Sequence, residues 1–141
     1  KRTFLAIFGA RVGKSVVIRP RVFIKNPKLL VIGDHVWIGR DVFIDNDERV
    51  EIGTNVCISQ RTNMITGSHN YFSNTFEYFG KEICIQNNVW IAAAVTILGG
   101  AKISNNVFVA TGCVVSGAID SGCRVSLMSH VKQTVTPGLL P

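Results

Sequence analysis

Three histidines are the side chains of this sequence best suited to proton transfer near neutral pH. A neutral imidazole, with a pKa of about 6.5 in model peptides, can act as a general base or a metal ligand. His69 follows Gly67-Ser68 inside the longest interruption of a regular repeat, whereas His35 and His130 occupy turn positions of that repeat. A single loop histidine is ordinarily exposed or a packing residue. Its place in the interruption nevertheless favours His69 as the catalytic candidate, with His35 and His130 as outward corner residues.

The sequence offers no second nucleophile of comparable promise. Neither a serine nor a cysteine stands in a triad-like context, which favours direct group transfer over a covalent intermediate. The cysteines at 57, 84, 113 and 123 never form a C-x-x-C pair, and no histidine cluster accompanies them. We therefore expect reduced, buried thiols in a cytoplasmic protein and no metal site.

A six-residue period predicts the elements that hold these residues. Aliphatic residues or Met occupy 16 of 17 positions at this step, in groups separated by two short interruptions and one long one, and the last group keeps its phase over eight repeats. The marked positions are Val12, Ile18, Ile24, Ile32, Ile38, Ile44, Ile52, Ile58, Met64, Ile85, Ile91, Ile97, Ile103, Val109, Val115, Ser121 and Leu127. The step of six matches neither a helix nor simple alternation.

A second apolar position, usually Val, lies four residues after most marked ones and therefore two residues before the next marked one. This side chain and the next marked one thus face the same side of a short strand. Gly and Asn, which tolerate positive φ, recur between them and suit sharp corners. Three such units make a triangular coil of about 18 residues. The fold class predicted is therefore all-β: a parallel β-helix stabilised by stacked aliphatic ladders.

Two short interruptions are expected to be corner bulges. They fall near Leu29-Leu30 and Arg49-Val50, where Lys28 and Glu48 occupy the slot otherwise held by a small inward residue.

The long interruption, from about 66 to 82, predicts a protruding excursion that contains five of the twelve aromatic residues. A protruding loop on a rigid scaffold is a usual place for function, although its aromatics could equally pack against a neighbouring subunit. The expected organisation is an N-terminal edge or anchoring segment over 1–11, a β-helix over 12–132 and a tail over 133–141.

Composition restricts the partners. The 141 residues carry a formal charge of +6, which suits either a phosphate-bearing partner or simply a solvated basic surface. No basic run or nucleic-acid-binding signature is present, so we expect no nucleic acid. With 47% hydrophobic and 17% charged residues, a monomer would expose much apolar surface, which favours an oligomer. No apolar run is long enough to span a bilayer, so at most peripheral membrane association is expected.

Several motifs together resemble the hexapeptide-repeat acetyltransferases, and within them the colanic acid biosynthesis acetyltransferase-like group. The motifs are Phe8-Gly9-Ala10-Arg11-Val12-Gly13, Val17-Ile18-Arg19-Pro20, Trp37-Ile38-Gly39, Ile44-Asp45-Asn46, Asn55-Val56-Cys57-Ile58-Ser59-Gln60, Thr66-Gly67-Ser68-His69 and Asn88-Val89-Trp90-Ile91-Ala92-Ala93. The similarity covers roughly residues 8 to 120. It implies a left-handed β-helix, a homotrimer with active sites in the clefts between subunits, acetyl-CoA as donor and no metal.

The resemblance also implies roles for single residues. His69 matches the general base for attack of a sugar or polysaccharide-precursor hydroxyl on the thioester. The implied donor contacts are Trp90 against the pantetheine arm, Ala93 at the thioester, Thr111 and Gly112 along the same groove, and Ser116 and Gly117 at the nucleotide end. The implied acceptor contacts are Asp45, Asn46 and Asp47. Two positions depart from the group: Asn70 stands where an Asp is usual, and Gly117 stands where relatives often have Lys.

Two alternatives stay open. A catalytically degenerate β-helix, serving as a scaffold or a CoA-binding protein, would keep the repeat without the chemistry. A zinc-dependent carbonic anhydrase on the same fold needs three histidines on adjacent coils, whereas those of this chain lie 34 and 61 residues apart.

Overall fold

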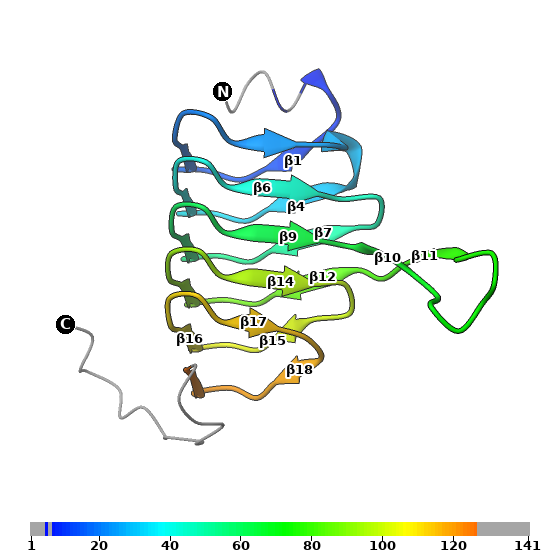
Figure 1. The fold of residues 1–141 in the computed structure, drawn as a ribbon. Helices are drawn as coiled ribbons and strands as arrows, with labels where there is room; N and C mark the ends of the chain where they lie inside the picture. Colours follow the sequence, from blue (N-terminus) through cyan, green and yellow to red (C-terminus); the bar gives the residue numbers. More distant parts are fainter. Residues whose placement is uncertain (1–4, 6, 127–141) are drawn as a thin grey trace.

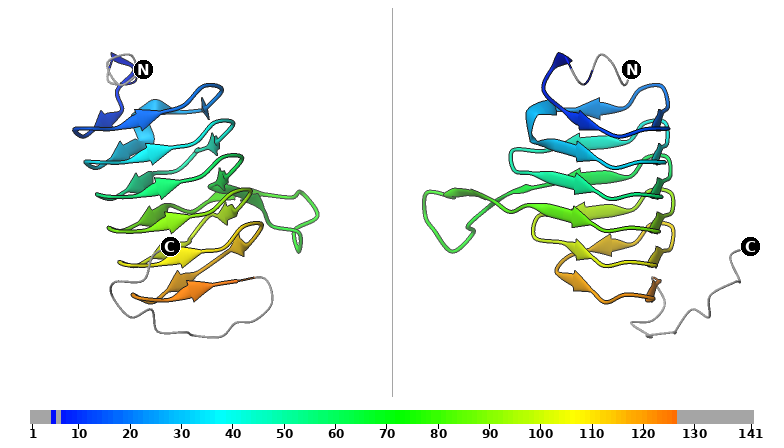
Figure 2. Two further views of the ribbon diagram at one scale, coloured as in Figure 1. Left: turned by 90° about the vertical axis from the view of Figure 1, so that its left-hand side faces the viewer. Right: turned by 180° about the vertical axis from the view of Figure 1, so that it is seen from behind.

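The computed structural model describes residues 5 and 7–126 of the chain, and these wind into a β-helix that carries a single projecting arm (Figure 1). Three parallel sheets form the three sides of a prism, and each turn of the chain, called a coil below, adds one strand to each side (Figure 2). This is the parallel β-helix predicted by the repeat, with the left hand that the family resemblance implied.

The strands divide among the three sheets in strict rotation. Sheet A contains β1 (Arg11–Val12), β4 (Leu30–Ile32), β7 (Val50–Ile52), β12 (Ile83–Ile85), β15 (Lys102–Ile103) and β18 (Ala118–Ile119). Sheet B contains β2 (Val17–Ile18), β5 (Trp37–Ile38), β8 (Cys57–Ile58), β13 (Trp90–Ile91), β16 (Phe108–Val109) and β19 (Arg124–Val125). Sheet C contains β3 (Phe23–Ile24), β6 (Phe43–Asp45), β9 (Asn63–Ile65), β14 (Thr96–Leu98) and β17 (Val114–Val115). We name the corners between them AB, BC and CA.

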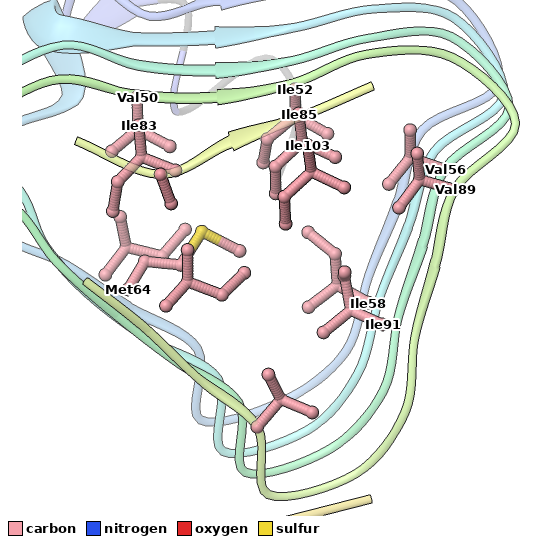
Figure 3. Close-up of a cluster of buried hydrophobic side chains, with 14 of the residues drawn as sticks. Val50, Ile52, Val56, Ile58, Met64, Ile83, Ile85, Val89, Ile91 and Ile103 are labelled. Carbon is pink, nitrogen blue, oxygen red and sulfur yellow. The ribbon is translucent and has the colours of Figure 1, made fainter. Parts of the chain in front are cut away.

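The core is a set of vertical aliphatic ladders. Ile52, Ile85 and Ile103 stack in successive coils, and each is at most 1% exposed (Figure 3). Val12, Ile18 and Ile24 of the first coil are only partly buried, because the coil that follows covers them on one side alone. The six-residue period therefore identified the inward face correctly over most of the chain.

The registers give the length of each coil. Val12 pairs with Ile32, and Ile32 with Ile52, twenty residues further on in both cases. The extra residues lie at corner CA, where a 3-10 turn, η1 (Pro27–Leu29), leaves Lys28 exposed and returns Leu30 to the core. The predicted bulges are confirmed as corner insertions.

The last coil corrects the expected phase. Ile119, not Ser121, pairs with Ile103, and Ser121 is exposed. Corner CA is two residues shorter here because only Ser116 and Gly117 separate β17 from β18, and Gly117 adopts a φ of 75° that permits the tight turn. The marked position Leu127 lies outside the described residues, as does the rest of the expected β-helix from 127 to 132.

Corner AB is a column of residues with positive φ. His35 belongs to this column and has a φ of 55°. Asn55, Asn88 and Asn106 occupy the equivalent corner position in the later coils. Its side chain is exposed, so the expectation that His35 is an outward corner residue is confirmed. His130 lies outside the described residues.

Two general features complete the fold. The four cysteines are all free, but only Cys113 is buried. Cys57 and Cys84 are half-buried because they sit on outward strand positions, and Cys123 is half-buried against the core in the last described coil. The described part of the chain contains no helix with the length and apolar character needed to cross a bilayer.

Candidate functional site

The projecting arm is a β-hairpin that leaves corner CA between the third and fourth coils (Figure 1). Its strands β10 (Gly67–His69) and β11 (Tyr78–Gly80) pair antiparallel, with His69 opposite Tyr78. At its base the Lys81 N–H donates to the carbonyl oxygen of Thr66 at 3.0 Å. The hairpin was not predicted, because its two strands are only three residues long and follow no repeat.

The geometry of His69 suits a proton acceptor. Its Nδ1 lies 2.7 Å from the carbonyl oxygen of Phe76. A carbonyl only accepts hydrogen bonds, so Nδ1 carries a proton, and in the neutral imidazole the lone pair is therefore on Nε2. The side chain is exposed, and within the described residues Nε2 has no hydrogen-bond partner. The imidazole is therefore oriented from one side and open on the other.

Asn70 forms hydrogen bonds within the hairpin loop that follows His69. Its N–H donates to the Glu77 carbonyl at 2.8 Å, and its side-chain oxygen accepts from the Phe72 N–H at 3.2 Å. Asn70 therefore shapes the hairpin loop, and the polar partner of the His69 ring is the carbonyl oxygen of Phe76.

Tyr78 connects the hairpin to the body of the β-helix. Its hydroxyl donates to Asp47 Oδ2 at 2.5 Å, and Lys25 Nζ lies 2.8 Å from the same oxygen and 3.0 Å from Asp45 Oδ1. The Tyr78 ring also meets the His69 ring edge-on, with centroids 5.4 Å apart. We call this set, Lys25, Asp45, Asp47 and Tyr78, the clasp.

The pKa values of the clasp residues and the close contact of Gly67 both reflect the hydrogen bond between Tyr78 and Asp47. Lys25 and the Tyr78 hydroxyl hold the pKa of Asp47 below its usual range, and the hydrogen bond to Asp47 raises the pKa of Tyr78. Gly67 lies against the Tyr78 hydroxyl, so any Cβ at this position would overlap it. Tyr78 was missed from the sequence because its partner lies 31 residues away and a tyrosine in a loop gives no local signal.

The structure corrects the expected role of Asn46. Its side chain is fully buried, accepts from the Asn26 N–H at 3.0 Å and donates to the Asn26 carbonyl at 2.8 Å. Thr66 occupies the equivalent place one coil on and is 1% exposed. Asn46 therefore ties adjacent coils together at corner CA and presents no free polar atom to an acceptor, whereas Asp45 and Asp47 remain partly exposed there.

Trp90 lies on the outward side of sheet B and is partly exposed. Its indole N–H donates to Ser59 Oγ at 3.1 Å, and its ring packs against Phe108 of the next coil with centroids 4.8 Å apart. These contacts fix one face of the indole on the sheet.

Ala93 and Gly112 meet at corner BC, where the Gly112 N–H donates to the Ala93 carbonyl at 3.0 Å. Among the described residues the Ala93 N–H has no acceptor, and Thr111 beside it is exposed. We call Ala93, Ala94, Thr111 and Gly112 the small-residue corner. Ser116 and Gly117 are exposed but lie at corner CA, across sheet C from it.

One chain does not bring the expected site residues together. The hairpin with His69 leaves corner CA and projects away from sheet B, which carries Trp90 and borders the small-residue corner (Figures 1 and 2). His69 and the clasp form one group, and Trp90 with the small-residue corner forms another.

The chain matches no protein-family model. Over 105 residues it is 38% identical to the protein named "Putative colanic acid biosynthesis acetyltransferase WcaF" of Escherichia coli strain K12, an overlap of 74% of this chain and 58% of that protein. It is 29% identical over 105 residues to the protein named "Putative acetyltransferase YJL218W" of Saccharomyces cerevisiae, covering 72% and 53% of the two chains. The chain thus spans less than two thirds of the length of these relatives.

Solved structures share the fold. The hexapeptide-repeat acetyltransferase VCA0836 of Vibrio cholerae, in complex with acetyl-CoA, superposes with a TM-score of 0.82 at 26% identity, over 86% of this chain and 68% of that one. A galactoside acetyltransferase in complex with CoA gives a TM-score of 0.78 at 22% identity, over 95% and 69%. The repeat, the left-handed β-helix with its single arm and these relatives together show that the chain belongs to the hexapeptide-repeat acetyltransferase family.

Proposed function

We propose that the protein transfers an acetyl group from acetyl-CoA to a hydroxyl of a sugar or polysaccharide precursor, with His69 as general base. The observation that carries this proposal is the 2.7 Å contact of His69 Nδ1 with the Phe76 carbonyl, which leaves Nε2 as the acceptor on an exposed ring. The acetyltransferase relatives, one of them solved with acetyl-CoA, supply the reaction class.

In the proposed reaction the acceptor hydroxyl gives its proton to His69 Nε2 as its oxygen attacks the thioester carbonyl carbon. The resulting oxyanion takes a hydrogen bond from a backbone N–H, for which that of Ala93 is the candidate. The C–S bond then breaks, and the CoA sulfur leaves with the proton returned by the imidazolium. Burial raises the pKa values of Cys57, Cys84 and Cys113, which makes these thiols poor nucleophiles and supports direct transfer.

For the donor, we propose that the pantetheine arm lies along Trp90 and the small-residue corner. Small side chains leave the shallow surface that an unbranched polyamide arm needs, and the partly exposed indole offers it a flat wall. Ser116 and Gly117 remain the proposed contacts of the nucleotide end. Such a donor is available in the cytoplasm, which is the proposed location.

For the acceptor, we propose contacts with Asp45 and Asp47 beside the hairpin. Lys25 and Tyr78 both bind Oδ2 of Asp47, and among the described residues Oδ1 has no partner. A carboxylate oxygen of this kind suits a sugar hydroxyl. Asn46 is no longer part of this proposal.

We further propose that a homotrimer completes the site. Because His69 and the small-residue corner lie on different sides of one chain, the hairpin of one subunit must reach the small-residue corner of the next. Outward aromatic side chains on the adjoining sheets support this assembly: Trp37 of sheet B is 44% exposed, and Phe23 of sheet C is 48% exposed and stacks on Phe43.

The decisive experiment is an acceptor screen. The protein is incubated with acetyl-CoA and a panel of free, nucleotide-linked and lipid-linked sugars, while thiol release and acetylated product are measured. Formation of an O-acetylated sugar supports the proposal. CoA binding without transfer to any acceptor would favour a degenerate CoA-binding protein, and absence of CoA binding would favour a scaffold.

A further inference from the structure

Corner BC carries a column of arginines beyond the small-residue corner. Arg21, Asp41 and Arg61 occupy equivalent positions in the first three coils, each with a φ between 58° and 60°. Arg40 precedes Asp41, and the Arg61 N–H donates to the Arg40 carbonyl at 3.1 Å. Neither the proposed acid–base chemistry nor the proposed donor contacts use these side chains.

The column has more positive than negative charge. Arg21 binds Asp41 in a bidentate pair, with N–O distances of 2.5 and 2.8 Å, so the one carboxylate of the column is already neutralised. Arg21, and more weakly Arg40 and Arg61, hold the pKa of Asp41 below its usual range, which places both further guanidinium charges near the pair. Arg40 and Arg61 are exposed, and neither forms an ion pair with any described residue.

The arginines stop where the small residues begin. The Ala94 N–H donates to the Gln60 carbonyl at 3.0 Å, so Arg61 lies directly beside Ala94 in the next coil. From that coil on, the corner carries Ala93, Ala94, Thr111 and Gly112 in place of long side chains. With the donor at the small-residue corner, as proposed above, the guanidinium groups of Arg40 and Arg61 lie beside the thioester that the acceptor must reach.

We propose that Arg40 and Arg61 bind the diphosphate of a sugar acceptor that is linked through a diphosphate to its carrier. The two residues belong to adjacent coils, about 4.8 Å apart, and a guanidinium binds phosphate oxygens in a bidentate manner. A diphosphate has enough negative charge to pair with both guanidinium groups, whereas a neutral free sugar has no charge that could pair with either. Nucleoside-diphosphate sugars and polyprenyl-diphosphate sugars share this chemistry. The identification of the bound diphosphate as part of the acceptor rests on the proposed function. The binding of a diphosphate by Arg40 and Arg61 does not.

The first test is binding of inorganic pyrophosphate to the full chain saturated with CoA, measured by calorimetry. Because a charge-assisted hydrogen bond commonly contributes about tenfold or more in affinity, Arg40→Gln and Arg61→Gln should each weaken binding by about that factor. Arg11→Gln, which removes the same charge from the outward side of sheet A, should leave binding unchanged. The proposal is wrong if the wild-type protein fails to bind pyrophosphate, if the variants bind it normally, or if CoA displaces it.

The second test compares three acceptors: a free sugar, a nucleoside-diphosphate sugar and a polyprenyl-diphosphate sugar. The double variant Arg40→Gln/Arg61→Gln should raise KM for the diphosphate-linked acceptor alone, and the arm that responds identifies the carrier. An equal effect of the double variant on KM for the free sugar would overturn the proposal. Dissociation of the oligomer would also overturn it, because Arg40 and Arg61 would then be subunit contacts. If no acceptor is acetylated while pyrophosphate binding still depends on both arginines, the diphosphate site is supported and the proposed transferase function is wrong.

Discussion

His69 is oriented by one backbone carbonyl, and its chemistry depends on the nitrogen left free. His69→Ala should therefore lower kcat by about 10² to 10⁴, the usual contribution of a general base. The dissociation constant of CoA should not change, because the proposed donor contacts lie elsewhere. Steady-state kinetics with the acceptor found in the screen, together with calorimetry for CoA, measure the two quantities.

His35 provides the matched control. It sits at corner AB with a φ of 55°, where later coils carry Asn55 and Asn88. His35→Asn should fold and turn over normally, because asparagine tolerates this conformation. If His69→Ala kept near wild-type turnover at saturating acceptor, the general-base mechanism would be wrong.

Tyr78 positions the hairpin rather than touching the reacting atoms. Tyr78→Phe keeps the ring beside His69 but removes the hydroxyl that donates to Asp47. We expect faster chymotryptic cleavage of the hairpin and a lower kcat with unchanged CoA affinity. Tyr71→Phe is the control, since Tyr71 lies 73% exposed in the loop, against Phe72, and its ring is retained. Equal cleavage rates in the two variants would show that the clasp does not hold the hairpin.

The clasp also predicts a pH dependence. The folded pKa of Asp47 is depressed, first by Lys25 and then by Tyr78, so its contribution to stability is present above the pKa of a free aspartate. That contribution is lost as the pH falls through the depressed value. Hairpin cleavage by an acid-active protease should therefore increase in the wild-type protein at low pH, with a smaller increase in Asp47→Asn, which has no carboxylate to protonate.

At the scale of elements, corner CA shows how coils are joined. Asn46 bonds both the N–H and the carbonyl of Asn26 from a fully buried position. Asn46→Ala should lower the free energy of unfolding by about 1 to 3 kcal/mol, because it leaves these backbone groups unpaired. Denaturant unfolding measures this loss, and the acceptor KM should not change. The opposite result, normal stability with a raised KM, would restore Asn46 to the acceptor site. Asp45→Ala is the comparison expected to raise that KM.

Sequence reasoning succeeded where an element repeats and failed where contacts are local exceptions. Ile52 and Ile85 are separated by the whole hairpin, yet the period alone identified both as inward, because burial in a stacked ladder allows little but aliphatic side chains. The shorter corner before Ile119 escaped detection because Ile119 and Val125 also fit the second apolar position of the unshifted repeat, four residues after Val115 and Ser121. The clasp joins residues from two coils and the hairpin and could be found only from coordinates.

At the scale of the molecule, the prediction is a trimer. Exposed aromatics on sheets B and C, with Phe72 of the hairpin 82% exposed, leave a large apolar surface for one chain of 15.4 kDa. Light scattering at micromolar concentration should report about three times that mass. The mass of a single chain would contradict the assembly.

A site divided between subunits predicts that two inactive variants restore activity when they assemble together, which a measurement of mass does not test. His69→Ala removes the base, and Thr111→Trp fills the exposed small-residue corner, so each homotrimer should be inactive. In trimers formed by co-expressing both variants, some clefts combine the intact hairpin of one subunit with the intact corner of another. Random assembly predicts about one quarter of the clefts to be of this kind, so about that share of wild-type activity should return. A site contained within one chain would recover no activity, because every subunit carries one of the two defects.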